Sequence, residues 1–224
     1  MCFSETSSYI NFFLLAGYGS MIYKTWRLSI PLWYLGLKDL LQGLLYKYID
    51  NPKVSNILGI LSYVHICFQP FIFNMAFSYF DTKKSQNTYW IFIFFITFIW
   101  GLWKLTKHET FDIQNDENCS DISSDFCASK NGGYIGKYHI GYKAVTEPTK
   151  FNLYIFFLFL PSLFTPAISI AFVLLTIVFI LKVFMDSKGV RDGEFAAIWC
   201  FISVIYLLPI AIFRKRLYQY FVKK

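Results

Sequence analysis

Long apolar stretches recur along this chain and are separated by short polar segments. A helix needs about 20 mostly apolar residues to cross roughly 30 Å of hydrocarbon, and several stretches approach that length. The 224 residues include 26 Phe, 16 Tyr and 6 Trp and are 56% hydrophobic, which exceeds what one soluble core of this size buries. The sequence therefore predicts that most of the chain lies in a lipid bilayer.

The apolar stretches divide into seven predicted helical spans. Their approximate bounds are 8–23, 28–48, 54–80, 88–104, 151–164, 167–186 and 194–213. Residues 151–185 would form one helix of roughly 50 Å, which is too long for a single crossing. Pro161 and Pro166 are expected to divide it into two spans; without that division the count falls to six. We expect an all-α bundle that forms a single transmembrane domain, 1–224, with residues 105–150 as a loop.

The basic residues between the spans predict the orientation. Segments on one side of the predicted membrane carry nine Lys or Arg residues, and the short segments on the other side carry four. Because short cytoplasmic segments are enriched in Lys and Arg, the C-terminus is expected in the cytoplasm and the N-terminus outside or in a lumen. The nine are Lys24, Arg27, Lys83, Lys84, Arg214, Lys215, Arg216, Lys223 and Lys224, and the four are Lys47, Lys53, Lys188 and Arg191.

With these spans, the protein is expected in an endomembrane or in the plasma membrane. The first apolar run has no basic segment ahead of it and no small-residue cleavage pattern after it, so we expect it to stay in the mature protein. The net charge of +7 is concentrated at the ends of the spans, which indicates contact with lipid headgroups and argues against nucleic-acid binding. The sequence leaves open whether the protein forms a homo-oligomer.

The loop after the fourth span is expected on the outer side. It holds six acidic and no basic residues from Glu109 to Asp125, and a disulfide between Cys119 and Cys127 suits an oxidising compartment. Asn118 begins a glycosylation sequon. The acidic half is equally consistent with a disordered spacer. The following stretch, "GGYIGKYHIGYKAV", alternates Tyr, Ile and Val between glycines and predicts a short β-hairpin over the outer face.

Ionisable and amide side chains interrupt the second and third spans. A charged side chain at mid-bilayer costs about 2.5–3.5 kcal/mol, so it normally faces the bundle interior, a partner or water. Gln42 lies three residues after Asp39 and four after Lys38, so it shares a helix face with each. We expect Asp39 and Gln42 to face inward, while Lys38 extends toward a surface or another helix.

The third span carries "YVHICFQP", in which His65 and Gln69 share a face. Pro70 cannot donate to the carbonyl of Ile66, so a kink and a free acceptor are expected there. His65 falls at about the depth of Asp39, and an Asp–His pair beside two amides suits a proton relay, a metal site or the activation of a thiol. The alternative is that these groups only join helices, through hydrogen bonds worth roughly 0.6–2 kcal/mol each.

Two cysteines extend this hypothesis. Cys2 at the N-terminus and Cys200 near the outer end of the last span are predicted to reach the same outer cavity as Asp39 and His65. Cys2, His65 and Cys200 would then suit zinc or copper, and Cys2 is also a candidate nucleophile. A structural Cys200 and a disulfide between Cys2 and Cys200 are the alternatives.

Several strings resemble one uncharacterised family of seven-span proteins. They are "MCFSETSSY", "KDLLQG", "HICFQP", "GKYHIGY" and "IWCFIS", and together they extend over nearly the whole chain. The resemblance implies a source among large DNA viruses of protists, protists, fungi and, more distantly, bacteria, but no activity. Here Lys38 stands where relatives are commonly uncharged, and Asp39 where they more often carry Glu. The residues it emphasises are Cys2, Asp39, Gln42, His65, Gln69, Pro70, Trp199 and Cys200.

These patterns predict a membrane-embedded enzyme or cofactor-binding protein whose cavity opens to the outer side. Asp39, His65 and Cys2 are its candidate catalytic residues, and Lys38, Gln42 and Gln69 would bind a lipid or a small amphiphile. One alternative is a transporter or channel for protons or cations, which requires polar residues through the inner half as well. Another is a receptor or scaffold that uses the outer loop.

Overall fold

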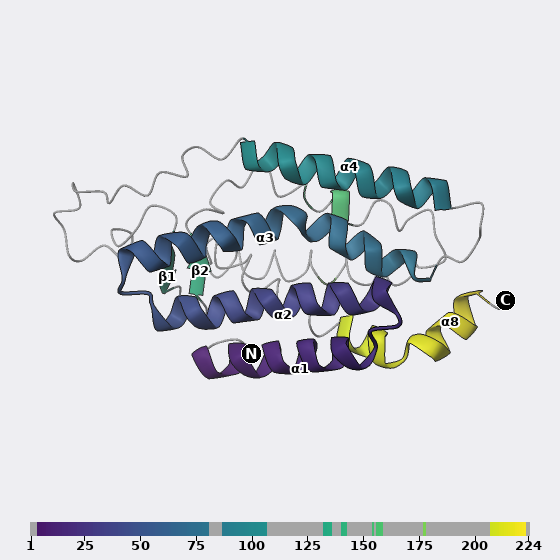
Figure 1. The fold of residues 1–224 in the computed structure, drawn as a ribbon, viewed down its shortest axis with the longest axis horizontal. Coiled ribbons are helices and arrows are strands. Elements are labelled where there is room, and N and C mark those ends of the chain that lie inside the picture. The colour runs from purple at the N-terminus through teal and green to yellow at the C-terminus, as the bar shows by residue number, and fades with distance from the viewer. Residues whose placement is uncertain are drawn as a thin grey trace.

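The computed structural model describes residues 4–80, 87–106, 132–135, 140–142, 154, 156–158, 177 and 207–222. Helices α1 (Glu5–Met21), α2 (Trp26–Lys47), α3 (Pro52–Ser78) and α4 (Asn87–Thr106) lie lengthwise beside one another (Figure 1). They confirm the first four predicted spans as helices, within three residues at each end. The other three spans lie mostly outside the described residues.

Local signals explain where two of these helices begin. Ser4 caps α1, because its hydroxyl accepts a hydrogen bond from the Ser7 amide while the Ser7 hydroxyl faces the Ser4 amide. The Asn51 side chain accepts from the Val54 amide, and Pro52 occupies the first turn of α3, where a proline sacrifices no intrahelical bond. Pro70 lies inside α3 without ending it.

Small residues bring α1 and α2 close together. A Cβ added to Gly19 would lie 3.0 Å from the Trp33 ring, and one added to Gly43 would lie 2.8 Å from the Tyr9 ring. The Ser29 hydroxyl also donates to the Gly19 carbonyl at 2.8 Å. The two helices are antiparallel, and glycine at the contact lets their backbones approach in the way typical of helices in membranes.

The described helices expose large apolar side chains and bury several polar ones within a largely apolar interior. Large hydrophobic residues of α1, α2 and α4 are exposed; Phe13 is 68% exposed and Phe95 is 64% exposed. By contrast, Lys38, Asp39 and His65 are buried. This is the reverse of a helical protein surrounded by water, where exposed large apolar surfaces are limited in extent.

Among the described residues, two helices are long and apolar enough to cross a membrane, and they lie within α3 and α4. The most apolar 18-residue stretch of α3 is 56% buried and that of α4 is 28% buried. Therefore α3 lies in the interior of the described bundle and α4 at its periphery.

A hairpin covers one end of α2 and α3, which we call the hairpin end. Its strands β1 (Gly133–Ile135) and β2 (Ile140–Tyr142) are antiparallel, which confirms the predicted hairpin. The Gly133 amide donates to the Ser55 hydroxyl at 3.2 Å, and the Ile140 amide donates to the Tyr46 hydroxyl at 3.1 Å. A Cβ on Gly133 would lie 2.6 Å from Leu45, so only glycine allows this close approach.

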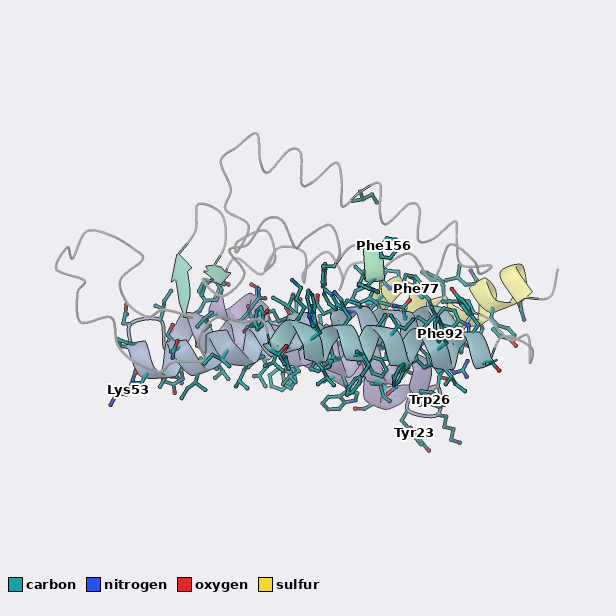
Figure 2. The ribbon with its side chains drawn as sticks, turned by 90° about the horizontal axis from the view of Figure 1, so that it is seen from above. Tyr23, Trp26, Lys53, Phe77, Phe92 and Phe156 are labelled. Carbon is teal, nitrogen blue, oxygen red and sulfur yellow. The ribbon has the colours of Figure 1, made fainter. Side chains whose placement is uncertain are left out.

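The opposite end, which we call the basic end, holds the turn between α1 and α2, the end of α3 and the C-terminal helix α8 (Arg214–Val222). Figure 2 shows Lys53 at the hairpin end and Tyr23 and Trp26 at the basic end. Arg27 donates to the Ser78 carbonyl at 3.0 Å and joins α2 to α3 there. Basic residues described at this end are Lys24, Arg27, Arg214, Lys215 and Arg216.

Candidate functional site

A cluster of polar side chains lies between α2 and α3. It contains Lys38, Asp39 and Gln42 of α2 and His65 and Gln69 of α3, all of them buried. The structure therefore buries five of the residues that the sequence singled out and brings His65 close to Gln69 and Lys38. We call this set, with Tyr34 and Tyr154, the polar cluster.

Tyr34 and His65 hold each other by two reciprocal hydrogen bonds. The Tyr34 hydroxyl donates to the His65 carbonyl at 2.6 Å, and His65 Nε2 lies 2.6 Å from the Tyr34 carbonyl. The two rings stack with centroids 3.8 Å apart and planes at 21°. Because a carbonyl can only accept, Nε2 carries the hydrogen, and the tautomer of His65 is thereby fixed.

Gln69 contacts the second ring nitrogen of His65. Its Nε2 lies 3.5 Å from His65 Nδ1, and the Tyr154 hydroxyl donates to its Oε1. These contacts form one chain of hydrogen-bonding groups, which leads from the Tyr154 hydroxyl through the Gln69 amide and the His65 ring to the Tyr34 carbonyl. Tyr154 of the predicted fifth span therefore helps, through Gln69, to position His65 of the third span.

Lys38 lies in the interior near His65 of α3, which agrees with the second of the two expected directions, toward another helix, and not with the first, toward a surface. The side chain is fully buried, and its charge is close enough to His65 for an electrostatic interaction. Lys38 follows Tyr34 by four residues, so both project from the face of α2 that meets His65. Asp39 is buried as well, but the hydrogen bonds described for the His65 ring come from Tyr34 and Gln69. The proposed action of Asp39 on His65 stays a prediction.

Tyr34 and Tyr154 were absent from the sequence-based site. Tyr34 had a usable signal, because its spacing from Lys38 places both on one helix face. Tyr154 lies 85 residues from Gln69, and no local pattern connects the two. The Tyr34 hydroxyl donates to the carbonyl of His65, and the predicted free carbonyl of Ile66 stays a prediction.

Polar residues of α3 follow the cluster toward the hairpin end on one face. Ser55, Ser62, His65 and Gln69 are buried and spaced by seven, three and four residues, so they fall within one side of the helix. We call these four residues the polar stripe. Its outer end meets the hairpin, through the bond from the Gly133 amide to Ser55.

The basic half of the bundle holds the larger of two apolar clusters, and the smaller one, of Leu41, Leu45, Leu58 and Ile140, lies at the hairpin end. Leu28, Leu32, Phe73, Phe77 and Phe80 belong to the larger cluster. Asn74 and Ser78 are buried in this half, but Asn74 is turned by about 140° from Gln69 around the helix axis. Their side chains donate to backbone carbonyls, Asn74 to Pro70 at 2.7 Å and Phe157 at 3.0 Å, and Ser78 to Met75 at 2.7 Å. Asn74 and Ser78 are therefore buried polar residues of α3 that do not belong to the polar stripe.

The remaining candidate ligands are placed only in part. Cys2, Cys119, Cys127 and Cys200 lie outside the described residues, so the predicted metal ligands and disulfide stay predictions. Within the described ranges, no group of three His, Cys, Asp or Glu side chains is arranged to hold a metal ion. Cys67 is a buried free thiol, and its carbonyl lies under Gly101 of α4, as expected of a residue that packs between helices.

The described fold and site define a helical protein with an apolar surface and a buried polar cluster. The chain belongs to a family of unknown function, DUF5765, which matches residues 10–218. None of the curated proteins and none of the solved structures matches it. The match agrees with the resemblance to an uncharacterised family, while the range of source organisms and the number of spans stay predictions.

Proposed function

We propose that this chain is a multi-pass membrane protein with seven spans, its basic end in the cytoplasm and its hairpin end outside or in a lumen. The exposed apolar surface of α1, α2 and α4 supports this location, because water around so many large side chains would be unfavourable. Lys24 and Arg27 at the basic end lie beside Tyr23 and Trp26, both exposed. Aromatic and basic residues together are typical of a membrane interface on its cytoplasmic side.

Alkaline extraction of membranes tests this location. We expect the wild-type chain and Phe95→Leu to stay with the membrane, whereas Phe95→Asp places a carboxylate near the centre of the exposed face of α4. That substitution costs about 3 kcal/mol in a bilayer and should reduce the integrated fraction. Equal integration of Phe95→Asp and Phe95→Leu, or a wild-type chain released by alkali, would contradict the proposal.

We infer that the function is ligand binding or catalysis at the polar cluster, in a site that communicates with the outer side. One observation carries this inference: the polar stripe runs along one face of α3 from Ser55 under the hairpin to His65 and Gln69, beside a small apolar cluster, whereas the larger apolar core of the basic half has no such stripe. This arrangement suits a closed-ended site better than a path through the membrane. The class of ligand that fits a polar site between lipid-facing helices is a lipid or a small amphiphile.

The chemistry assigned to the cluster is acid–base chemistry at His65. With hydrogen on Nε2, Nδ1 is the position at which the ring can take a proton. Gln69 contacts Nδ1 through its amide nitrogen, so rotation of that amide would expose the lone pair to a ligand. The buried Lys38 and Asp39 supply charges that would bind a polar headgroup or stabilise a charged intermediate.

The experiment is mass spectrometry of small molecules and metals retained by the purified full-length protein. We expect the wild type to retain a ligand that His65→Ala loses, and that the matched variant His139→Ala, in the predicted outer loop, keeps. Zinc or copper lost from both His65→Ala and Cys2→Ser would assign Cys2 as a ligand. Equal retention by His65→Ala and the wild type, or no retained molecule in either, would contradict a binding site at the cluster.

The runner-up is proton- or cation-linked transport. Asn74 and Ser78 favour it, because these polar residues continue along α3 to the basic end and Asn74 meets the segment that carries Tyr154. Proteoliposomes that contain a pH-sensitive dye distinguish the two functions. Transport predicts proton flux that falls to the protein-free level in His65→Gln and persists in His139→Gln. Binding or catalysis predicts no flux above that level in any of the three proteins.

A further inference from the structure

Helix α8 is fixed against the basic end of the bundle by contacts on one of its faces. Arg214 donates to the Tyr18 hydroxyl at 3.0 Å and to the Ala211 carbonyl at 2.9 Å. Leu217 packs against the buried hydrophobic cluster, and the ring of Tyr218 lies 5.9 Å from that of Tyr79. These three residues are spaced by three and one, so they occupy one side of α8 and determine which side faces outward.

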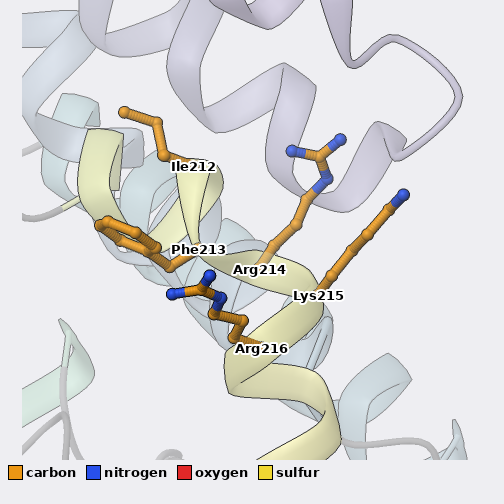
Figure 3. A pocket seen from close by; sticks show the side chains of 5 residues that line it. All are labelled: Ile212, Phe213, Arg214, Lys215 and Arg216. Atoms are coloured by element: carbon orange, nitrogen blue, oxygen red, sulfur yellow. The ribbon is translucent and has the colours of Figure 1, made fainter.

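The outward side combines basic and apolar residues around a small hollow. Its lining consists of Ile212, Phe213, Arg214, Lys215 and Arg216 (Figure 3). Ile212 and Phe213 are 48% and 50% exposed, and Lys215 and Arg216 are exposed as well. In Figure 3 the side chains of Arg214 and Lys215 extend to one side of the chain and that of Arg216 to the other. Arg214 is already engaged with Tyr18, which leaves the exposed Lys215 and Arg216 as the cations accessible to a ligand.

We propose that this surface, residues 212–216, binds the headgroup of an anionic phospholipid in the cytoplasmic leaflet. Arg216 contacts the phosphate, because arginine matches phosphate with parallel hydrogen bonds, and Lys215 adds to the positive charge of the surface from the other side of the chain. Ile212 and Phe213 lie against the upper acyl chain. The proposal rests on the membrane location proposed above, but not on any function of the polar cluster.

Two features select a lipid as the occupant. The surface is positively charged, which complements the anionic lipids of a cytoplasmic leaflet. It also places two large apolar side chains next to the cations, and a soluble anion would leave these in water. Tyr23 and Trp26 are exposed at the same end of the helices (Figure 2), at the level where aromatic residues meet headgroups.

Lipid retention by the full-length protein tests the proposal. The protein is purified in a mild detergent and incubated with equal amounts of phosphatidylglycerol and phosphatidylcholine that have identical acyl chains. Native mass spectrometry then counts the molecules of each lipid bound per chain. A basic residue near an anionic lipid surface contributes about fivefold in binding, so we expect wild-type protein to retain phosphatidylglycerol several-fold more than phosphatidylcholine.

The matched variants are Lys215→Gln/Arg216→Gln at this surface and Lys47→Gln/Lys53→Gln at the hairpin end. We expect the first to retain both lipids nearly equally and the second to keep the wild-type preference. Equal retention by the wild type, an unchanged preference in Lys215→Gln/Arg216→Gln, or displacement of phosphatidylglycerol by excess inorganic phosphate would overturn the proposal. Alkaline extraction, measured separately on the same variants, reports on membrane integration and distinguishes a failure of that premise.

Discussion

The two halves of the bundle differ in what their interior contains. Toward the hairpin end, α2 and α3 bury Lys38, Asp39, Gln42 and the polar stripe, beside a small apolar cluster of Leu41, Leu45, Leu58 and Ile140. Toward the basic end, the same two helices meet through Leu28, Leu32, Phe73 and Phe77. An apolar contact between helices gains little in lipid beyond close packing, whereas polar groups in hydrocarbon must find partners. The comparison teaches that the basic half contributes mainly close packing, whereas the hairpin half holds the buried polar groups on which the proposed function rests.

The largest effect is expected from removal of an aromatic ring in the basic half. Phe73 is 1% exposed within the hydrophobic cluster, so Phe73→Ala should leave a cavity and lower the free energy of unfolding by about 4 kcal/mol. The measurement is thermal or denaturant unfolding of the purified protein in detergent. Phe95→Ala removes the same ring from an exposed position and should change stability by less than about 0.5 kcal/mol. Similar losses in both variants would mean that the basic half is not a packed core.

The next effect concerns the inner end of the polar stripe. Gln69→Leu removes the acceptor of the Tyr154 hydroxyl and the amide that contacts His65 Nδ1. Buried groups left without partners cost about 1–3 kcal/mol each, so we expect a loss of about 2 kcal/mol in unfolding free energy together with loss of the retained ligand. Ser78→Ala is the control, because it removes only a bond to the carbonyl of Met75. A ligand retained by Gln69→Leu would indicate that Gln69 only joins helices.

A third effect tests the contact between α3 and α4 close to the polar cluster. A Cβ at Gly101 would lie 2.8 Å from the Phe68 ring and 3.0 Å from the Cys67 carbonyl. Gly101→Ala should therefore separate the helices and cost about 1.5 kcal/mol in unfolding free energy. Gly17→Ala in α1 meets nothing within 4 Å and should be neutral or slightly stabilising, since alanine favours helix formation. Equal stability of the two variants would mean that α4 does not approach α3 this closely.

The smallest effect is expected at the tyrosine that holds His65. Tyr34→Phe keeps the stacked ring but removes the hydrogen bond to the His65 carbonyl, at a cost of about 1 kcal/mol. Ligand retention should persist, because the Tyr34 carbonyl still fixes Nε2. Loss of the ligand without loss of stability would assign the hydroxyl itself to the binding site.

Part of the site could be predicted from local spacing. Gln42 was placed on the face of Asp39, and Gln69 on the face of His65, because residues three or four apart share a helix face. The inward direction of these groups followed from the cost of polar atoms in hydrocarbon. For Lys38 the sequence left two directions open, because a long side chain can either extend to an interface or reach another helix. Nothing in α2 alone distinguishes these outcomes; the neighbouring His65 and Tyr34 do.

The sequence by itself determined the helices α1 to α4, the hairpin and the difference between a basic and a non-basic end, since each depends on residues close together in the chain. Only the tertiary structure decided that Tyr34 hydrogen-bonds to His65 and that Tyr154 hydrogen-bonds to Gln69. It also decided that the polar residues of α3 form a stripe in one half of the bundle and bind backbone carbonyls singly in the other. The physical reason is that side-chain partners across a bundle depend on the rotation and depth of each helix. Packing against all the neighbours sets both, and no single segment encodes them.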